Sequence, residues 1–314
     1  MPAVEVPTEK WKGKIREVTL GGGGRKTVVV GGESTLPFLH FEGEMPNRPV
    51  IAIEIQDCEP EWPGQLVAAW GDAVKDPARW AKAAAAAGAD MIALSLESAH
   101  PDNQNTGAKE AEAAVKKVLD AVDLPLMVFG PYVAEKDNEV LVAAADAARG
   151  TVIALGSCEE KNYRTIVAAC LASGHVAIAK TPIEINLAKQ LNILITDMGL
   201  PADRILVDPT TGALGYGLEY TYSVMERLRL AGLQGDGMTG LPLMVTPGEE
   251  AWRQKEAKAA DGVPEAWGKI ENRAIIWEAM TATSLLLAGA DVLVMRHPKA
   301  IELVKATIDK WMAK

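Results

Sequence analysis

The chain has 314 residues, of which 48% are hydrophobic and 24% charged, and its formal net charge is −10. This composition is typical of a globular protein, and the length suits either two ordinary domains or one α/β barrel. The acidic balance argues against a nucleic acid or an anionic membrane as a partner. The three cysteines, Cys58, Cys158 and Cys170, are far apart. Their number and spacing predict neither a disulfide framework nor a zinc or iron–sulfur site in this chain.

The amino-terminal residues lack a basic segment followed by an apolar core, so we expect no signal peptide. No apolar run approaches the ~20 residues that a membrane-spanning helix requires. The expected location is therefore the reducing cytoplasm.

Residues 1–48 differ from the rest of the chain. Two runs rich in β-formers, 14–20 and 25–30, flank four consecutive glycines at 21–24, which predicts a β-hairpin. Because these glycines precede a strand rather than a helix, they do not fit the dinucleotide-binding fingerprint. We expect residues 1–48 to form a hairpin and a link, with the hairpin closing the amino-terminal mouth of a barrel.

From residue 49 onward, short apolar runs alternate with helical patterns. Continuous apolar runs are typical of parallel strands that are buried on both faces. Eight such strand–helix units predict a (β/α)8 TIM barrel over residues 49–314, with an open doubly wound sheet as the alternative. The predicted strands cover 50–55, 91–96, 124–129, 152–155, 176–179, 204–207, 241–245 and 292–295. The predicted helices cover 76–87, 108–122, 138–148, 163–172, 185–198, the segment leading to 230, 270–287 and 300–312.

The loop at 208–217 follows the sixth predicted strand and contains Gly212, Gly215 and Gly217. Asp208 would lie at the carboxyl end of that strand, where parallel α/β folds bind ligands. The glycines either let the backbone approach a ligand closely or form a turn that caps the next helix.

Four other side chains are candidates because of their place after strands. His100 and His297 each precede a proline and suit an acid/base, a ligand or a structural role. Lys180 is a candidate for a Schiff base. Arg296 suits a phosphate or carboxylate partner, or an ion pair across the barrel mouth. The loops together are rich in amides, hydroxyls and glycine, and poor in the paired groups that hydrolysis requires, so they do not define a reaction.

Six local strings stand out along the chain: STLPFL (34–39), FEGEMP (41–46), SAHPDNQN (98–105), INLAKQLN (185–192), DPTTGALGYGLEY (208–220) and MRHPK (295–299). Taken together, they closely resemble the small subunit of the corrinoid/iron–sulfur protein of the acetyl-CoA (Wood–Ljungdahl) pathway. The archaeal delta subunit of acetyl-CoA decarbonylase/synthase is the homologous alternative. The resemblance spans nearly the whole chain.

The resemblance implies a role in carbon fixation as half of a heterodimer. The large subunit would carry a [4Fe–4S] cluster and a cobalamin-binding domain, and this barrel would cover the cobalamin between them. The pair would take a methyl group from methyltetrahydrofolate:corrinoid methyltransferase and pass it to acetyl-CoA synthase. This chain would then be a non-catalytic carrier subunit. The alternatives are a pterin-binding TIM-barrel methyltransferase, with Asp208 and Asn105 holding the pterin, and a lyase that uses Lys180.

A corrin ring bears a rim of amide side chains, which would be matched by amides, hydroxyls and backbone groups. Loop position, rather than the resemblance, selects the cobalamin contacts, and no catalytic or metal-binding residue is assigned. The first choices are Asn105, Thr211, Gly212, Gly215 and Tyr216, and the second choices are His100, Lys180, Arg296 and His297.

Overall fold

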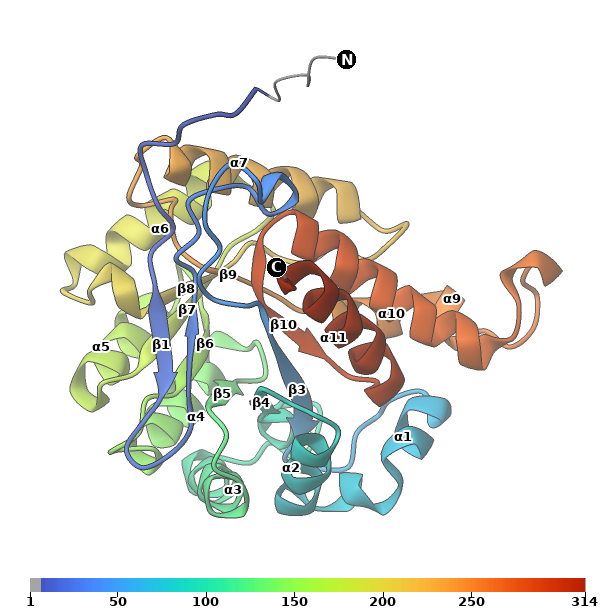
Figure 1. The fold of residues 1–314 in the computed structure, drawn as a ribbon. Coiled ribbons are helices and arrows are strands. Elements are labelled where there is room, and N and C mark those ends of the chain that lie inside the picture. Colours follow the sequence, from blue (N-terminus) through green and yellow to red (C-terminus); the bar gives the residue numbers. More distant parts are fainter. Residues whose placement is uncertain (1–6, 314) are drawn as a thin grey trace.

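Eight parallel strands form a closed barrel in the computed structural model, which describes residues 7–313 (Figure 1). The strands follow one another around the barrel in chain order, and β10 closes the ring against β3. The predicted (β/α)8 barrel is therefore confirmed, and the open-sheet alternative is wrong. The strands are β3 (Val50–Gln56), β4 (Met91–Ser95), β5 (Leu126–Phe129), β6 (Ala154–Cys158), β7 (Val176–Lys180), β8 (Ile205–Asp208), β9 (Leu243–Val245) and β10 (Ala290–Met295).

The outer layer consists of helices that follow the strands. The first of them begins as the sequence predicts, because the Asp76 side chain accepts a hydrogen bond from the Arg79 amide and Pro77 occupies the first turn. Helix α4 begins at Ala134, earlier than predicted, because its polar first turn hides the apolar periodicity. The ring contains α2 (Pro77–Ala86), α3 (Ala108–Ala121), α4 (Ala134–Ala147), α5 (Tyr163–Ser173), α6 (Ile185–Asp197), α7 (Leu218–Leu233), α10 (Ile270–Leu287) and α11 (Pro298–Met312).

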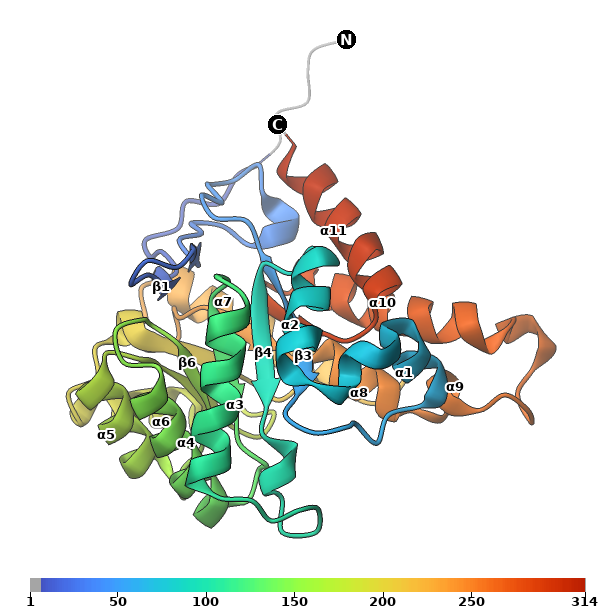
Figure 2. The same cartoon turned by 90° about the horizontal axis from the view of Figure 1, so that it is seen from below.

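Three further helices lie in the loops after β3 and β9, and the sequence did not predict them. They are too short to show a clear 3.6-residue period. Figures 1 and 2 both show the chain between α9 and α10 projecting from the barrel on the side of α1. These helices are α1 (Gly64–Trp70), α8 (Pro247–Arg253) and α9 (Lys255–Lys258). The 3-10 turns are η1 (Pro37–Leu39), η2 (Gly71–Lys75), η3 (Glu97–Ala99), η4 (Ala202–Arg204) and η5 (Glu265–Trp267).

The amino-terminal hairpin closes the end of the barrel at which the strands begin, as predicted. We call this the lower end, and we call the end at which the strands finish the upper end. Strands β1 (Val18–Gly21) and β2 (Thr27–Val30) pair antiparallel. The buried side chains of Leu20 and Val30 pack in one cluster with Val50 and Met91, which begin β3 and β4. Figure 2 shows the arrowhead of β4 pointing away from the hairpin, toward the opposite end of the barrel. The division of the chain into domains 1–48 and 49–314 stays a prediction.

The barrel interior changes from apolar to polar along the strands. On β3, Val50 and Ala52 belong to the interior cluster, while Ile51 and Ile53 face the helices. Side chains alternate between the two faces of a strand, so Glu54 continues the interior row toward the carboxyl end. The fold therefore places a polar layer on top of apolar layers, at the end where α/β barrels present their functional loops.

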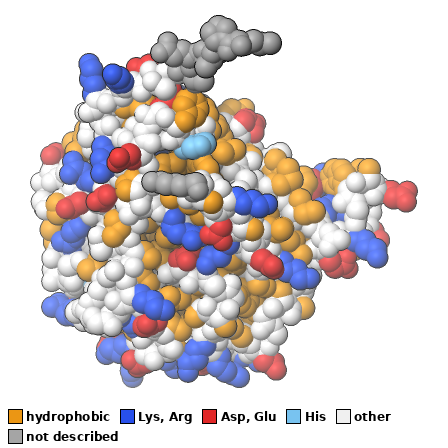
Figure 3. Space-filling view, viewed as in Figure 1, with side chains coloured by type: hydrophobic (Ala, Val, Ile, Leu, Met, Phe, Trp, Pro, Cys, Tyr) orange, Lys and Arg blue, Asp and Glu red, His pale blue; other side chains and the backbone are white. Residues whose placement is uncertain are grey.

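The surface mixes charges of both signs. On the face shown in Figure 3, Lys and Arg side chains are interspersed with Asp and Glu. Within residues 7–313, every helix falls short of the length and apolarity needed to cross a membrane.

Candidate functional site

The carboxyl-terminal mouth of the barrel is ringed by polar side chains. Each follows an interior apolar residue of its strand by two positions, such as Arg296 after Val294 and Lys180 after Ile178. The period of two along a strand therefore carries the interior row into the mouth. The ring contains Glu54, Ser95, Lys180, Asp208, Thr246 and Arg296.

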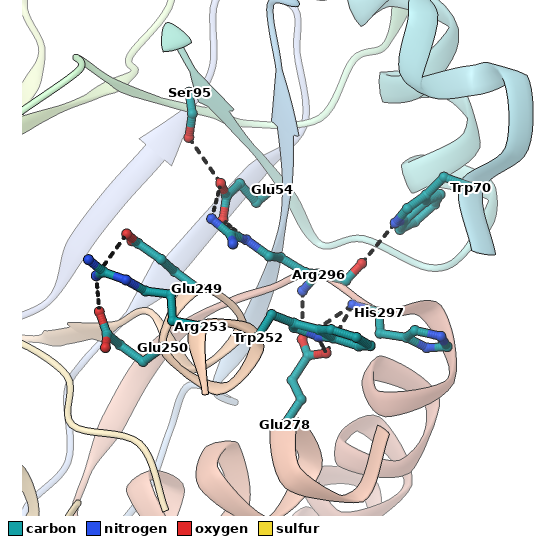
Figure 4. A network of polar contacts seen from close by, with 10 residues as sticks. All are labelled: Glu54, Trp70, Ser95, Glu249, Glu250, Trp252, Arg253, Glu278, Arg296 and His297. Atoms are coloured by element: carbon teal, nitrogen blue, oxygen red, sulfur yellow. Dashed lines mark hydrogen bonds and ion pairs between the residues drawn. The ribbon is translucent and has the colours of Figure 1, made fainter. Parts of the chain in front are cut away.

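A bidentate ion pair crosses the mouth from β3 to the end of β10 (Figure 4). Arg296 Nε and Nη2 donate to the two carboxylate oxygens of Glu54, both at 2.7 Å. The guanidinium also lies 4.6 Å from the centre of the Trp62 ring, which favours the cation. Burial lowers the pKa of Arg296, but the carboxylates of Glu54, Glu249 and Glu278 together raise it above its ordinary value, so this guanidinium stays charged. Of the two roles that the sequence left open for Arg296, the structure shows the ion pair across the mouth.

Glu278 on α10 organises the chain just after β10. Its carboxylate accepts hydrogen bonds from the amide of Arg296 at 2.6 Å and from Trp252 Nε1 at 2.7 Å (Figure 4). Burial raises the pKa of Glu278 to about 7. His297 caps α11 by accepting from the Lys299 amide, and its ring stacks on Trp252 at 5.6 Å. Burial lowers the pKa of His297 to about 4, so the imidazole is neutral near pH 7 and holds a structural position.

A second buried ion pair joins β7 to β8. Lys180 Nζ lies 3.5 Å from Asp208 Oδ2 and 4.5 Å from the centre of the Tyr132 ring. Burial lowers the pKa of Lys180, but Asp208, Glu249 and Glu159 together raise it above its ordinary value. Burial raises the pKa of Asp208, and the Lys180 ammonium beside it opposes that shift, which favours an ion pair between the two. A charged lysine is a poor nucleophile, so this environment does not favour a Schiff base.

These side chains fill the mouth. The cavity between them has a volume of about 10 Å³ and is lined by Glu54, Phe129, Tyr132, Glu249 and Arg296, among others. A space of about this size holds roughly one water molecule. The centre of the barrel top therefore has no room for a small-molecule substrate in this conformation.

The loop at 208–217 is braced against its own helix. Thr211 Oγ1 accepts from the Thr246 amide at 2.9 Å, and the Gly212 amide donates to Thr221 Oγ1 at 2.8 Å. A side-chain Cβ on Gly212 would lie 2.5 Å from the Gly217 carbonyl oxygen, so only glycine fits there. These contacts match the turn-and-cap interpretation of the glycines.

The other end of this loop faces outward. Gly215 has φ +77° and lies beside Trp277. Tyr216 is 42% exposed, and its hydroxyl donates to Glu256 on α9 at 2.7 Å. Tyr216 is therefore held at the rim rather than in the mouth.

His100 and Asn105 lie in a separate loop after β4. Asp57 accepts from the Ser98 amide at 2.9 Å and so ties this loop to the end of β3. His100 Nδ1 accepts from the Asp102 amide at 3.1 Å, and Asn105 is exposed with φ +50°. Neither residue is among those that line the filled mouth.

A cleft of about 620 Å³ opens beside the mouth, between helix α6 and the loop that precedes α5, and we call it the α5–α6 cleft. Its size is within the range of ligand pockets, ~300–1,000 Å³. One wall is apolar and comes from α6, and the opposite rim is polar. It is lined by Glu159, Glu160, Lys161, Lys180, Thr181, Pro182, Leu187, Gln190, Leu191, Leu194 and Thr210. Of the predicted site residues, Lys180 alone belongs to this lining.

Thr181 is the unusual member of the cleft. It is 7% exposed, and its hydroxyl oxygen is buried without a hydrogen-bond partner. Buried polar groups are normally paired, so such an atom calls for an explanation. The sequence indicated only that Thr181 follows a strand.

Two residues of the mouth were missed by sequence reasoning as well. Glu54 was hidden inside an apolar strand, although its spacing from Val50 and Ala52 places it on the interior row. Glu278 lies in the middle of α10, far from any strand end, and its position gives no such signal.

The side chains that could bind a metal ion are dispersed over the described part of the chain. Within residues 7–313, no three His, Cys, Asp or Glu side chains gather closely enough to hold a metal ion. Cys158 and Cys170 are buried, and Cys58 is partly exposed.

The barrel resembles that of dihydropteroate synthases. The Xanthomonas albilineans enzyme with 4-aminobenzoic acid superposes with a TM-score of 0.58 at 14% identity, covering 86% of this chain and 95% of that one. The Coxiella burnetii enzyme with pteroic acid gives 0.58 at 13% identity, covering 87% and 96%. At this identity the likeness defines the fold class alone, a dihydropteroate-synthase-like eight-stranded barrel.

Sequence comparison defines the family. The profile described as the CO dehydrogenase/acetyl-CoA synthase delta subunit matches residues 17–308. The acetyl-CoA decarbonylase/synthase complex subunit delta of Archaeoglobus fulgidus is 40% identical over 310 residues, which is 95% of this chain and 68% of that protein. The Methanocaldococcus jannaschii subunit delta is 35% identical over 314 residues, 96% of this chain and 75% of that protein. The chain belongs to the CO dehydrogenase/acetyl-CoA synthase delta subunit family, and the resemblance noted from the sequence is confirmed.

Proposed function

We propose that this chain is the small subunit of a corrinoid/iron–sulfur methyl carrier, in which its barrel covers a corrinoid held mainly by a larger subunit. The relatives are named as subunits of a complex, which supports a role within an assembly. The observation that carries the proposal is the filled mouth of the barrel. A barrel whose central site is occupied by its own side chains is suited to cover a ligand rather than to enclose one.

The filled mouth disfavours the alternative of an independent pterin-binding methyltransferase. A drug-sized ligand occupies a pocket of ~300 Å³ or more. The mouth offers about 10 Å³. Making room for a pterin there would separate buried ion pairs, and an unpaired buried charge costs several kcal/mol, roughly 3–5. Asp208 is already paired with Lys180, and Asn105 lies in another loop.

The residues beside the mouth fit a corrinoid better. When bound, a corrinoid supplies a cobalt centre that carries the methyl group. In this chain, Thr181 and Gln190 would pair with amide side chains of the corrin edge, and Leu187 and Leu191 would exclude water from its apolar parts. The unpaired Thr181 hydroxyl supports this fit. Asn105, Thr211, Gly212, Gly215, Tyr216, His100, Arg296 and His297 stay predictions as cobalamin contacts.

An apolar stripe on α10 supports a protein partner. Ile276, Met280 and Leu287 lie on one face of this helix and are 48%, 49% and 42% exposed. Exposed apolar side chains gathered on one helix face are typical of surfaces that another chain covers. The proposed partners are the large subunit with its [4Fe–4S] cluster, methyltetrahydrofolate:corrinoid methyltransferase and acetyl-CoA synthase. The proposed location is the cytoplasm.

A titration of the isolated chain with tetrahydrofolate tests the proposal against the alternative. We expect no binding at micromolar concentrations and no methyl transfer from methyltetrahydrofolate to free cobalamin. Tight binding together with transfer would show that the chain is an enzyme and would overturn the carrier proposal. Borohydride trapping with small carbonyl compounds tests the lyase alternative, and we expect no adduct at Lys180.

A further inference from the structure

We propose that the α5–α6 cleft recognises a neutral carboxamide side chain of the corrinoid, and that the Thr181 hydroxyl pairs with it. This inference rests on the proposed function and assigns one part of the ligand to one place on the chain. It also predicts a specificity: the cleft should accept an amide and reject the corresponding carboxylate.

The first support is the way in which Thr181 is held. Its amide donates to the Asp208 carbonyl at 3.1 Å, and its carbonyl accepts from Thr210 Oγ1 at 2.6 Å. The backbone is therefore fixed on both sides, while the buried hydroxyl has no partner. A hydroxyl both donates and accepts, and a primary amide offers both complementary groups.

The second support is the charge balance of the cleft. Lys180 is paired with Asp208, and Lys161 Nζ lies 3.2 Å from Glu159. Both cations of the lining are thus engaged, whereas the carboxylate of Glu160 adds further negative charge. A carboxylate ligand would meet like charge in a partly buried site and would find no free cation, so a neutral group is favoured.

The third support is the apolar wall. Leu187, Leu191 and Leu194 lie on the cleft side of α6, at helical spacing. Leu187 is 41% exposed in the isolated chain. The carbon skeleton between a macrocycle and its amide groups would cover this wall and remove it from water.

The test uses the complex of this chain with its cobalamin-carrying partner. The apparent Kd for cobalamin is measured by titrating the corrinoid-free complex and following visible absorbance. Thr181→Val keeps the shape of the side chain and removes the hydroxyl, and Thr181→Ser retains the hydroxyl. Thr196→Val is the matched control, because Thr196 is a threonine on α6 that lies outside the cleft and donates to the Asn192 and Ile193 carbonyls.

We expect Thr181→Val to raise the Kd by roughly threefold to tenfold, the range for one hydrogen bond. Thr181→Ser and Thr196→Val should leave the Kd within twofold. Without corrinoid, Thr181→Val should keep or raise the melting temperature of the lone chain, because it removes an unpaired buried group. Equal Kd values for Thr181→Val and Thr196→Val would overturn the inference.

A second arm varies the ligand on the unaltered complex, so it does not depend on how a variant folds. Cobalamin is compared with its monocarboxylic acids, in each of which one peripheral amide is replaced by a carboxylate. We expect at least one isomer to bind more than fivefold more weakly to the complex but not to the partner alone. Equal affinity for all isomers would overturn the amide specificity. If the subunit leaves cobalamin binding by the partner unchanged, the proposed function itself fails.

Discussion

The two ends of this barrel are both closed, but by different chemistry. At the amino-terminal end, Leu20 and Val30 of the hairpin pack on the apolar row that begins with Val50. At the carboxyl-terminal end, the closure consists of Glu54 with Arg296 and of Asp208 with Lys180. A hydrophobic plug excludes water through burial of apolar area alone, whereas buried ions must offset a large desolvation cost.

The difference indicates what each end is for. A buried ion pair is weak evidence for stability, because well-packed apolar residues of similar volume often stabilise a fold as much or more. The charged closure stands where barrel enzymes keep their active sites. We infer that the upper end is shaped for an interface with a polar ligand and that the lower end serves stability.

The largest expected effect comes from breaking the mouth ion pair. Arg296→Met leaves Glu54 buried without its partner and should lower the free energy of unfolding by about 3–5 kcal/mol, measured by urea denaturation. The double variant Glu54→Leu/Arg296→Met should recover most of that loss, because no uncompensated charge remains. A double variant as unstable as the single one would contradict this view of the upper end.

A buried carboxylate at the upper end should also make the free energy of unfolding depend on pH. Asp137 on α4 accepts from the Tyr132 amide at 3.1 Å and is 3% exposed, and burial raises its pKa to about 7. Between about pH 4 and 7 the unfolded chain releases this proton while the folded chain keeps it. Its contribution is therefore present below about pH 4 and is lost as the pH rises through 7.

Asp137→Asn keeps the acceptor oxygen and removes the titration. The variant should be more stable than the unaltered chain at pH 8 by up to about 4 kcal/mol, and this gain should vanish near pH 4. Urea denaturation at pH 4.5, 6 and 8 measures it. A difference that does not change with pH would show that Asp137 is not the source.

At the lower end, the free energy of unfolding should depend on the volume of the buried side chains and not on charge. Leu20→Ala removes a fully buried side chain beneath the barrel and should cost about 3 kcal/mol in the free energy of unfolding. The loss should be the same at pH 6 and pH 8, and cobalamin binding by the folded complex should not change. A large loss of cobalamin affinity would mean that the two ends are coupled.

The smallest effect is expected for a pair that belongs to neither end. Arg149 lies 2.8 Å from Asp146 on the surface, and the two side chains are 62% and 58% exposed. Arg149→Ala should change the free energy of unfolding by less than about 0.5 kcal/mol. A loss comparable to that of Arg296→Met would remove the contrast between buried and exposed pairs.

The sequence predicted the barrel because its strands are buried on both faces and so read as continuous apolar runs. It did not predict α8 and α9, because these helices are short and contain several charged residues. Their apolar residues therefore show no clear helical periodicity. Within the site, position just after a strand pointed to Arg296 and Lys180. Glu54 lies inside its strand, so the same rule did not select it. The partner of Glu278, the amide of Arg296, depends on how α10 packs on β10, and no local pattern encodes that contact.

The candidate cobalamin contacts also show what the sequence can and cannot reveal. The glycines of the 208–217 loop were chosen for their freedom to approach a ligand, yet Gly212 is required by its closeness to Gly217. Thr181 was present in the predicted loops but had no distinguishing mark. Its missing hydrogen bond is a property of the folded environment, which a single sequence does not contain.

The proposed role of the filled barrel is to cover a corrinoid that belongs mainly to another chain. The most direct measurement is the visible spectrum of this chain purified alone and after co-expression with the large subunit in cells supplied with cobalamin. We predict a colourless lone chain and a stable coloured heterodimer that loses cobalamin more slowly than the large subunit does by itself. A lone chain that holds a stoichiometric corrinoid, or a large subunit that retains cobalamin equally well without it, would contradict the account.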